Sequence, residues 1–277
     1  MTVGSATRVT AQPSPALRGY VMSYDGFEQH GFPPGVHRGA PGRHLTLIVS
    51  LSEPIRVVPV EGCTVRDGRF DAVVGGLTSK AVAIRHDGRQ HGVKVSLTPM
   101  GARAVYGMPA AALANDVVDV GQILGGLGRE LSERSREAHS WRERFAALDD
   151  VLLAAVRGHD MSPAARADIQ PEVREAWRRL LNSRGTVQIG SLAAELGWSR
   201  RHLTRKFHGE IGLTPKEAAR VLRFEHAYVL ATAGTPPSWS TIAAATGFAD
   251  QAHLVRDWRD FTGLTPTAWR GSELLVH

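Results

Sequence analysis

The chain has 277 residues, of which 43% are hydrophobic and 22% are charged, and its formal net charge is +6. This length accommodates two domains with separate cores, and the modest positive charge suits an anionic partner such as nucleic acid. The single cysteine, Cys63, excludes a disulfide framework and a thiolate metal site. We expect Cys63 to be a buried apolar residue rather than a redox sensor.

Residues 17–99 are predicted to form short strands. Segments rich in β-branched residues, such as HLTLIVSL and HGVKVSLTP, alternate with Gly, Pro and Asp at regular intervals. This rhythm is typical of a small antiparallel barrel or sandwich.

Residues 101–158 are predicted to be helical. Trp141, Phe145, Leu148, Leu152 and Val156 fall near one stripe of a helix, with charged residues opposite. The stripe has two interpretations: the helix packs on its own domain, or it forms a dimer interface. The following residues, 159–171, are poor in apolar side chains and contain two prolines, so we interpret them as a linker.

The C-terminal part contains a repeat. Gly197 to Pro215 (GWSRRHLTRKFHGEIGLTP) recurs as Gly247 to Pro266 (GFADQAHLVRDWRDFTGLTP), with one extra residue after the Gly-aromatic pair. Apolar segments, IGSLAAEL and STIAAAT, precede the two copies. Each copy therefore predicts a helix, a tight turn and a second helix with a polar outer face, which is a helix-turn-helix.

Local signals define the turns and caps of the two repeats. Gly197 is expected to end a helix in the left-handed conformation. Ser199 and Asp250 are expected to cap the second helix of each repeat, and Pro215 is expected to open a connecting helix that runs to about Thr232.

The stretch from Val173 to Arg270 resembles the AraC/XylS family of transcription regulators. The features that carry the resemblance are the tandem repeats, the closing Gly-Leu-Thr-Pro and the connecting segment LRFEHAYVLATA. The resemblance implies an α+β chain. Its parts would be a cupin-like effector-binding and dimerisation domain (1–158), the linker (159–171) and a DNA-binding domain (172–277) with units at about 189–211 and 239–262. It also implies double-stranded DNA and RNA polymerase as partners, with a small-molecule effector and a homodimer as further expectations.

The outer faces of the two recognition helices carry the predicted DNA contacts. Arginine donates two hydrogen bonds to a guanine edge, and base contacts come from the first turns of such helices. The predicted base-reading residues are Arg201, Thr204, Arg205, Gln251, His253 and Arg256. The predicted phosphate contacts are Arg200, Lys206 and the helix starts near Thr186 and Ser240. We expect the second repeat to contribute less to the affinity for DNA, because three aspartates lie in or beside it: Asp250, Asp257 and Asp260.

The alternative is a cupin-type metal-dependent enzyme fused to a DNA-binding domain. Its candidate ligands are His37, His44, His86 and His91, with Glu53 and Glu61 between them. The paired His-x-His followed by glutamate that such a site needs is absent, as is any Ser/His/Asp set or phosphate-binding loop. We therefore expect no enzyme activity, cofactor or metal. The sequence has no signal core or membrane-length apolar run, so we expect a cytoplasmic, nucleoid-associated protein.

Overall fold

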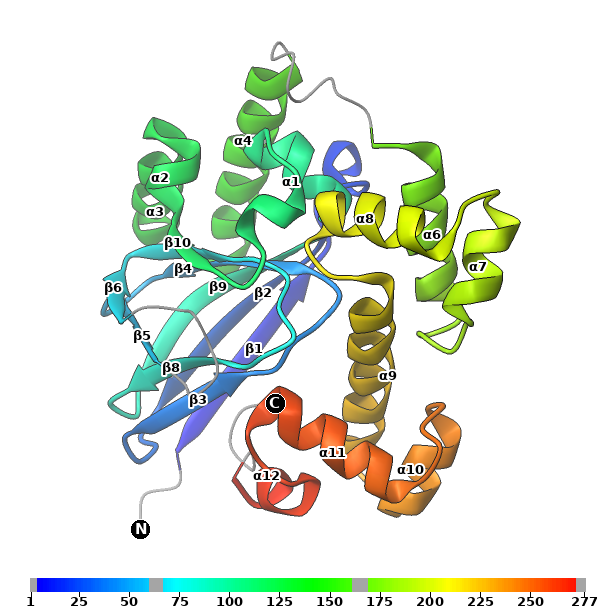
Figure 1. The fold of residues 1–277 in the computed structure, drawn as a ribbon. Coiled ribbons are helices and arrows are strands. Elements are labelled where there is room, and N and C mark those ends of the chain that lie inside the picture. The colour runs from blue at the N-terminus through cyan, green and yellow to red at the C-terminus, as the bar shows by residue number, and fades with distance from the viewer. Residues whose placement is uncertain (1–3, 60–66, 161–168, 273–277) are drawn as a thin grey trace. The chain divides into compact units, whose positions relative to one another are not determined.

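The computed structural model describes residues 4–59, 67–160 and 169–272, so Cys63, Glu61 and most of the predicted linker lie outside the described residues. The chain divides into two compact units (Figure 1). The first is the N-terminal domain. The second is the C-terminal domain, which contains the chain from residue 169 together with residues 39–43 and 77–81. No described helix is both long enough and apolar enough to cross a membrane.

Alternating apolar residues build a six-stranded antiparallel sheet in the N-terminal domain. Leu47 and Val49 in one strand are cross-strand partners of Val95 and Val93 in another, and all four are fully buried. This pattern is the alternation expected of a sheet with one covered face. In spatial order the strands are β1 (Ser5–Ala11), β2 (Val21–His30), β9 (Gln90–Leu97), β4 (Leu45–Ser50), β7 (Ala72–Gly75) and β10 (Val117–Asp119).

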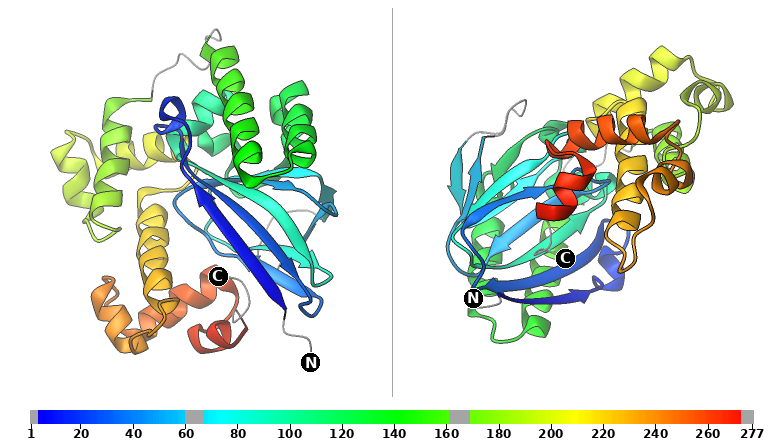
Figure 2. Two further views of the ribbon diagram at one scale, coloured as in Figure 1. Left: turned by 180° about the vertical axis from the view of Figure 1, so that it is seen from behind. Right: turned by 90° about the horizontal axis from the view of Figure 1, so that it is seen from below.

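Helices of the same domain cover that apolar face and gather on one side of the sheets (Figure 2). Tyr24 of β2 stacks on Phe145 with ring centroids 5.8 Å apart, and its hydroxyl donates to Asp149 at 2.7 Å. Leu148 is fully buried, so the predicted apolar stripe packs within its own domain. The helices are η1 (Pro15–Leu17), α1 (Pro99–Tyr106), η2 (Ala110–Leu113), α2 (Val120–Leu124), α3 (Gly126–Glu137) and α4 (Trp141–Asp160).

The other strands form a separate four-stranded sheet, so of the two arrangements expected, a small barrel or a sandwich, the described strands form two sheets and no closed barrel. The strands of this four-stranded sheet are β3 (Gly35–Gly39), β8 (Val82–His86), β5 (Ile55–Val58) and β6 (Gly68–Phe70), in that spatial order. Among the described strands, hydrogen-bonded pairing stays within each sheet. The strands of the second sheet are three to five residues long. The α+β class predicted from the sequence is confirmed.

The described C-terminal domain from residue 169 onward is built of helices. Its helices are α6 (Pro171–Asn182), α7 (Ile189–Glu195), α8 (Arg200–Ile211), α9 (Pro215–Ala231), α10 (Trp239–Ala245), α11 (Gln251–Thr262) and α12 (Pro266–Ser272). The connecting helix α9 begins with a capping box: Thr214 accepts from the Glu217 amide, and Glu217 accepts from the Thr214 amide. Figure 1 shows α8 at one end of α9 and α11 at the other.

Candidate nucleic-acid interface

The first repeat is formed by α7, a short turn and α8. Gly197 has φ +70°, and the Trp198 amide donates to the Ala193 carbonyl at 2.9 Å, which closes the end of α7. Ser199 caps α8 by accepting from the His202 amide at 3.2 Å. These features confirm the turn and cap that the sequence predicts. Three apolar side chains anchor α8 in the core: Leu203, Phe207 and Ile211, each fully buried.

The second repeat has the same construction from α10 and α11. Gly247 has φ +78°, and the Asp250 carboxylate caps α11 by accepting from the His253 amide at 2.6 Å. Trp258 is fully buried against Phe224 of α9 and Trp269 of α12, with ring centroids 5.0 and 5.1 Å away. Aromatic packing of this kind fixes the inner face of α11, so the opposite face is left for a ligand.

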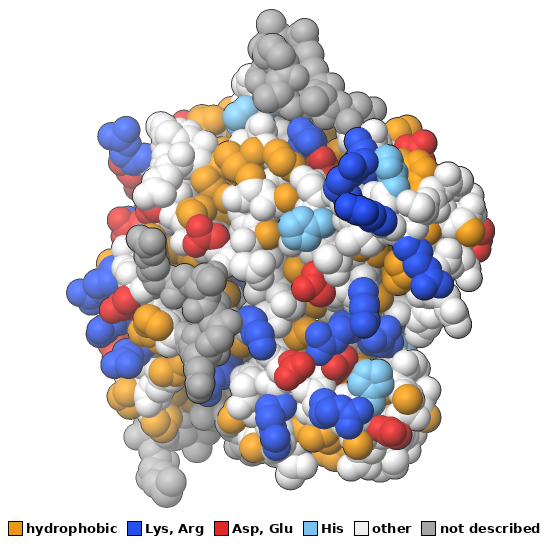
Figure 3. Space-filling view, viewed as in Figure 1, with side chains coloured by type: hydrophobic (Ala, Val, Ile, Leu, Met, Phe, Trp, Pro, Cys, Tyr) orange, Lys and Arg blue, Asp and Glu red, His pale blue; other side chains and the backbone are white. Residues whose placement is uncertain are grey.

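The outer face of α8 carries the cations predicted to contact DNA. Arg200, Arg201 and Arg205 are exposed, while Thr204 and Lys206 are half-buried. Arg205 Nη2 lies 3.3 Å from His202 Nδ1, and the His202 ring packs edge-on to Trp198 with centroids 4.6 Å apart. The turn of the repeat thus supports the guanidinium of Arg205. Figure 3 shows Lys and Arg side chains recurring across the C-terminal domain on the visible face.

The outer face of α11 presents fewer of the side chains predicted to contact DNA. Gln251 and Arg256 are exposed, and Arg259 is also exposed on this helix. His253 is held differently: its Nδ1 accepts from the Ala249 amide at 3.4 Å and its Nε2 lies 3.8 Å from Asp257 Oδ2. The structure therefore places Gln251 and Arg256 toward solvent, while the ring nitrogens of His253 face groups of its own repeat.

The two predicted helix-start positions lie outside the recognition helices. Thr186 lies three residues before the start of α7, and its hydroxyl donates to the Ser183 carbonyl at 2.8 Å. Ser240 is the second residue of α10, and its hydroxyl lies 2.9 Å from that of Ser238. Ser238, which the sequence analysis missed, is the residue that caps α10. The Ser at 238 followed by Thr at 241 was a usable signal, since Ser is a favoured N-cap.

The three aspartates of the second repeat are already engaged within the domain. Asp250 serves as the cap of α11. Asp257 is 5% exposed and accepts from Arg220 of α9 at 2.7 and 3.2 Å, and Asp260 accepts from the same guanidinium at 3.0 Å. This role of Arg220 was not predicted from the sequence. The helical spacing of Asp257 with the apolar Leu254 and Phe261 does place it on the inner face, but spacing cannot identify a partner on another helix.

The histidines considered as metal ligands are spread over different strands. His37 lies in β3 and His86 in β8 of the smaller sheet, whereas His91 lies in β9 of the larger sheet, and His44 directly precedes β4. Across residues 4–59, 67–160 and 169–272, no three His, Cys, Asp or Glu side chains form a group that could hold a metal ion.

Comparisons with known proteins agree with this geometry. Residues 192–272 match the family described as "Helix-turn-helix domain". An uncharacterized HTH-type transcriptional regulator of Staphylococcus aureus is 32% identical over 85 residues, which is 31% of this chain and 11% of that protein. YbfI of Bacillus subtilis, also an HTH-type transcriptional regulator, is 35% identical over 68 residues, or 24% of each chain. The similarity thus covers a small share of the length of these relatives.

Among solved structures, ToxT of Vibrio cholerae with a bound unsaturated fatty acid is similar over 99% of this chain and 96% of its own, with a TM-score of 0.53 and 11% identity. At that identity the likeness concerns the two-domain fold. The tandem repeats, their caps and the family match together identify the C-terminal domain of this chain as a member of the AraC-type helix-turn-helix domains of DNA-binding transcription regulators.

Proposed function

We propose that the chain is a sequence-specific regulator of transcription that binds double-stranded DNA through α8 and α11. The observation that carries this proposal is the outer face of α8, where three arginines are exposed while Leu203 and Phe207 lock the opposite face into the core. A rigid helix with exposed guanidinium groups in its first two turns suits the major groove. In this proposal Arg201, Thr204 and Arg205 read bases, with Gln251 and Arg256 in the corresponding role on α11. His253, also predicted to read bases, instead directs its ring nitrogens to groups of its own repeat.

The test separates base contacts from backbone contacts. The bound sequence is first selected from a random DNA pool with the full chain, and Arg205→Ala and Lys206→Ala are then compared on that sequence and on random DNA. Arg205→Ala should cost about 1–3 kcal/mol on the selected site only, and should relax the preference at one base position. Lys206→Ala should weaken binding to all sequences alike and lower the salt slope by about one.

A matched control is Arg178→Ala on α6. Arg178 is an exposed arginine that donates to Glu175 at 2.6 Å and lies outside both recognition helices. It should leave both affinities unchanged. If Arg205→Ala weakens binding to selected and random DNA equally, then Arg205 contacts the backbone and the base-reading role is wrong. If the full chain shows no salt-sensitive DNA binding, the proposed function is wrong.

The N-terminal domain is proposed to act as a sensor of a small-molecule effector and as a dimerisation unit. The support is its attachment to a DNA-binding domain and its fold similarity to ToxT, whose structure holds a fatty acid. Further proposals are RNA polymerase as a partner and a location at the nucleoid. We propose that the chain has no enzyme activity. The alternative, a metal-dependent enzyme, is tested by a zinc and iron assay on the purified chain. A stoichiometric amount of either metal would favour the enzyme.

A further inference from the structure

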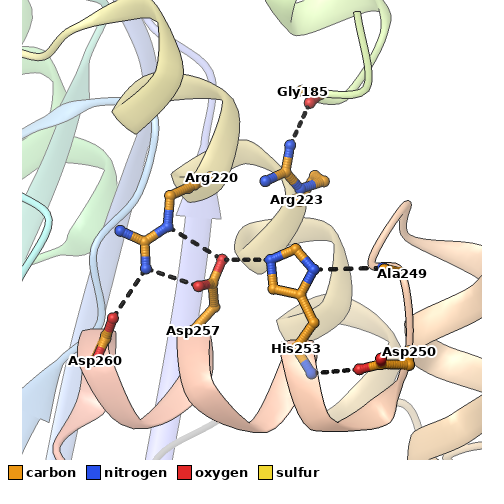
Figure 4. Close-up of polar contacts among 8 residues, drawn as sticks. All are labelled: Gly185, Arg220, Arg223, Ala249, Asp250, His253, Asp257 and Asp260. Atoms are coloured by element: carbon orange, nitrogen blue, oxygen red, sulfur yellow. Dashed lines mark hydrogen bonds and ion pairs between the residues drawn. The ribbon is translucent and has the colours of Figure 1, made fainter.

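The connecting helix α9 carries two arginines, one turn apart, that contact other elements of the C-terminal domain (Figure 4). Arg220 reaches α11, and Arg223 reaches the turn between α6 and α7. Neither residue lies on a recognition helix. Their contacts decide how the second repeat is held relative to α9, and the second repeat would have to be held in one orientation to read DNA.

Arg220 makes a two-pronged contact with a buried carboxylate. Its Nη2 donates to Asp257 Oδ1 at 2.7 Å and its Nε donates to Asp257 Oδ2 at 3.2 Å. Nη2 also donates to Asp260 Oδ2 at 3.0 Å, and the guanidinium lies over the Phe261 ring at 5.1 Å. The hydrogen bond with Asp257 raises the pKa of Arg220 above its usual range. This planar fork constrains both the distance and the rotation of α11, which a point charge would not do.

The contact continues from Asp257 to the turn before α11. Asp257 Oδ2 lies 3.8 Å from His253 Nε2, and His253 Nδ1 accepts a hydrogen bond from the Ala249 amide. Since Nδ1 is the acceptor, the geometry places the proton of the neutral ring on Nε2, facing the carboxylate. A connected set of polar contacts therefore runs from α9 through α11 to the turn of the second repeat.

Arg223 and Gly247 connect the second repeat to the turn between α6 and α7, which leads into the first repeat. Arg223 Nη1 donates to the Gly185 carbonyl at 2.8 Å, while its guanidinium lies over the Phe248 ring at 5.6 Å. A Cβ on Gly247 would lie 2.7 Å from Thr186 Cγ2, so the turn of the second repeat closely approaches the turn between α6 and α7. The second repeat is thus held at its turn, and the two-pronged contact of Arg220 acts together with the aromatic packing of Trp258 to fix the rotation of α11.

We propose that Arg220 is a positioning residue for DNA reading by the second repeat, acting through Asp257 without touching DNA. This inference rests on the proposed function, in which α11 enters a major groove. Arg256 and Asp257 are neighbours on α11, so they point about 100° apart around the helix. Arg220 keeps the Asp257 carboxylate buried with its negative charge balanced by the guanidinium. This contact thereby keeps Arg256 on the outer face of α11.

The test uses the full chain and two DNA duplexes, the selected site and the same site with the bases under α11 scrambled. The wild type should lose about tenfold in affinity on scrambling, which is the effect of one bidentate base contact. Arg220→Met should bind the scrambled site like the wild type, but should bind the selected site about tenfold more weakly than the wild type, at the level of the scrambled site. Arg220→Lys keeps the charge without the fork, so it should recover only part of the discrimination.

Two further variants separate positioning from stability. Arg179→Met is the matched control, because Arg179 also pairs with two carboxylates, Glu175 and Glu195, but between α6 and α7. It should leave the discrimination intact. The double variant Arg220→Met, Asp257→Leu removes the unpaired carboxylate. It should melt near the wild-type temperature and still fail to discriminate the two duplexes.

Each contrary result has a distinct meaning. Full discrimination by Arg220→Met, or its return in the double variant, would overturn the positioning role. An equal loss on both duplexes with a smaller salt slope would show that Arg220 itself contacts phosphate, which also overturns it. A wild type that does not respond to scrambling would instead refute base reading by α11, and the inference would fall with that part of the proposed function.

Discussion

In the proposed complex α8 and α11 each contact one short stretch of the DNA, here called a contact patch. Inserting five base pairs between the two contact patches tests whether α9 holds the repeats at one spacing. The helix has 17 residues, so at 1.5 Å per residue it is about 25 Å long. Successive major grooves on one face of a duplex lie about 34 Å apart, a gap that α9 and the width of the two repeats together span. One chain should therefore protect two patches about ten base pairs apart.

The magnitude follows from how firmly the second repeat is attached. The Arg223 contact with Gly185 and the close approach of Gly247 to Thr186 hold the second repeat in place. The second repeat therefore cannot move with its contact patch when the patch is displaced along the DNA. Five base pairs turn that patch to the opposite face of the duplex, so the contacts of Gln251 and Arg256 are lost together. One bidentate contact is worth about 1–3 kcal/mol, which corresponds to a loss of about 5- to 150-fold in affinity.

Fluorescence anisotropy at one fixed salt concentration measures this loss. The control duplex carries the same five base pairs outside both patches and should bind like the original site. The inserted duplex should bind with the affinity that the first repeat has alone, as given by a site with the second patch scrambled. Unchanged affinity after the internal insertion would refute the reasoning, and would show that the second repeat serves packing or a protein contact instead.

Three further predictions concern the stability of the two domains. Leu148→Ala should lower the unfolding free energy by about 2–5 kcal/mol in chemical denaturation, because Leu148 is fully buried within its own domain; a smaller loss with a change in oligomeric state would place it at an interface. Gly247→Ala should lower the melting temperature, because φ is +78° and the new Cβ would meet Thr186 Cγ2; a left-handed alanine alone costs about 1–2 kcal/mol, so an unchanged melting curve would contradict the conformation of this turn. Burial acts to raise the pKa of Asp25, but the hydrogen bond from Arg8 and the charges of Lys94 and Arg8 hold it below its ordinary value of 3.8. The stabilisation from Asp25 is therefore complete above that value and is lost as the pH falls through the lower folded pKa, so Asp25→Asn should melt earlier at neutral pH and should lose less stability on acidification than the wild type.

The sequence alone determined the C-terminal helices, their turns and the faces of the recognition helices. These features depend on residues close together along the chain: Gly197 as a left-handed stop, Ser199 and Asp250 as caps, and apolar residues at helical spacing. Because the two copies of the repeat align in the same register, each of these signals occurs twice in the sequence. This redundancy explains why the prediction of a tandem helix-turn-helix was confirmed. The prediction that the two recognition faces contact DNA is also a reading of local pattern, and it stays a prediction.

Only the tertiary structure decided which residues meet across the chain. Arg220 and Asp257 are 37 positions apart, and no local pattern pairs them, so the aspartates of the second repeat looked like a weakness until the structure showed their partners. The strand rhythm of residues 17–99 likewise did not determine whether the strands close into a barrel or form two sheets, since alternation fixes the faces of a strand but not its neighbours. The apolar stripe around Leu148 fitted a dimer interface as well as a core, because periodicity shows that a face is covered without showing what covers it.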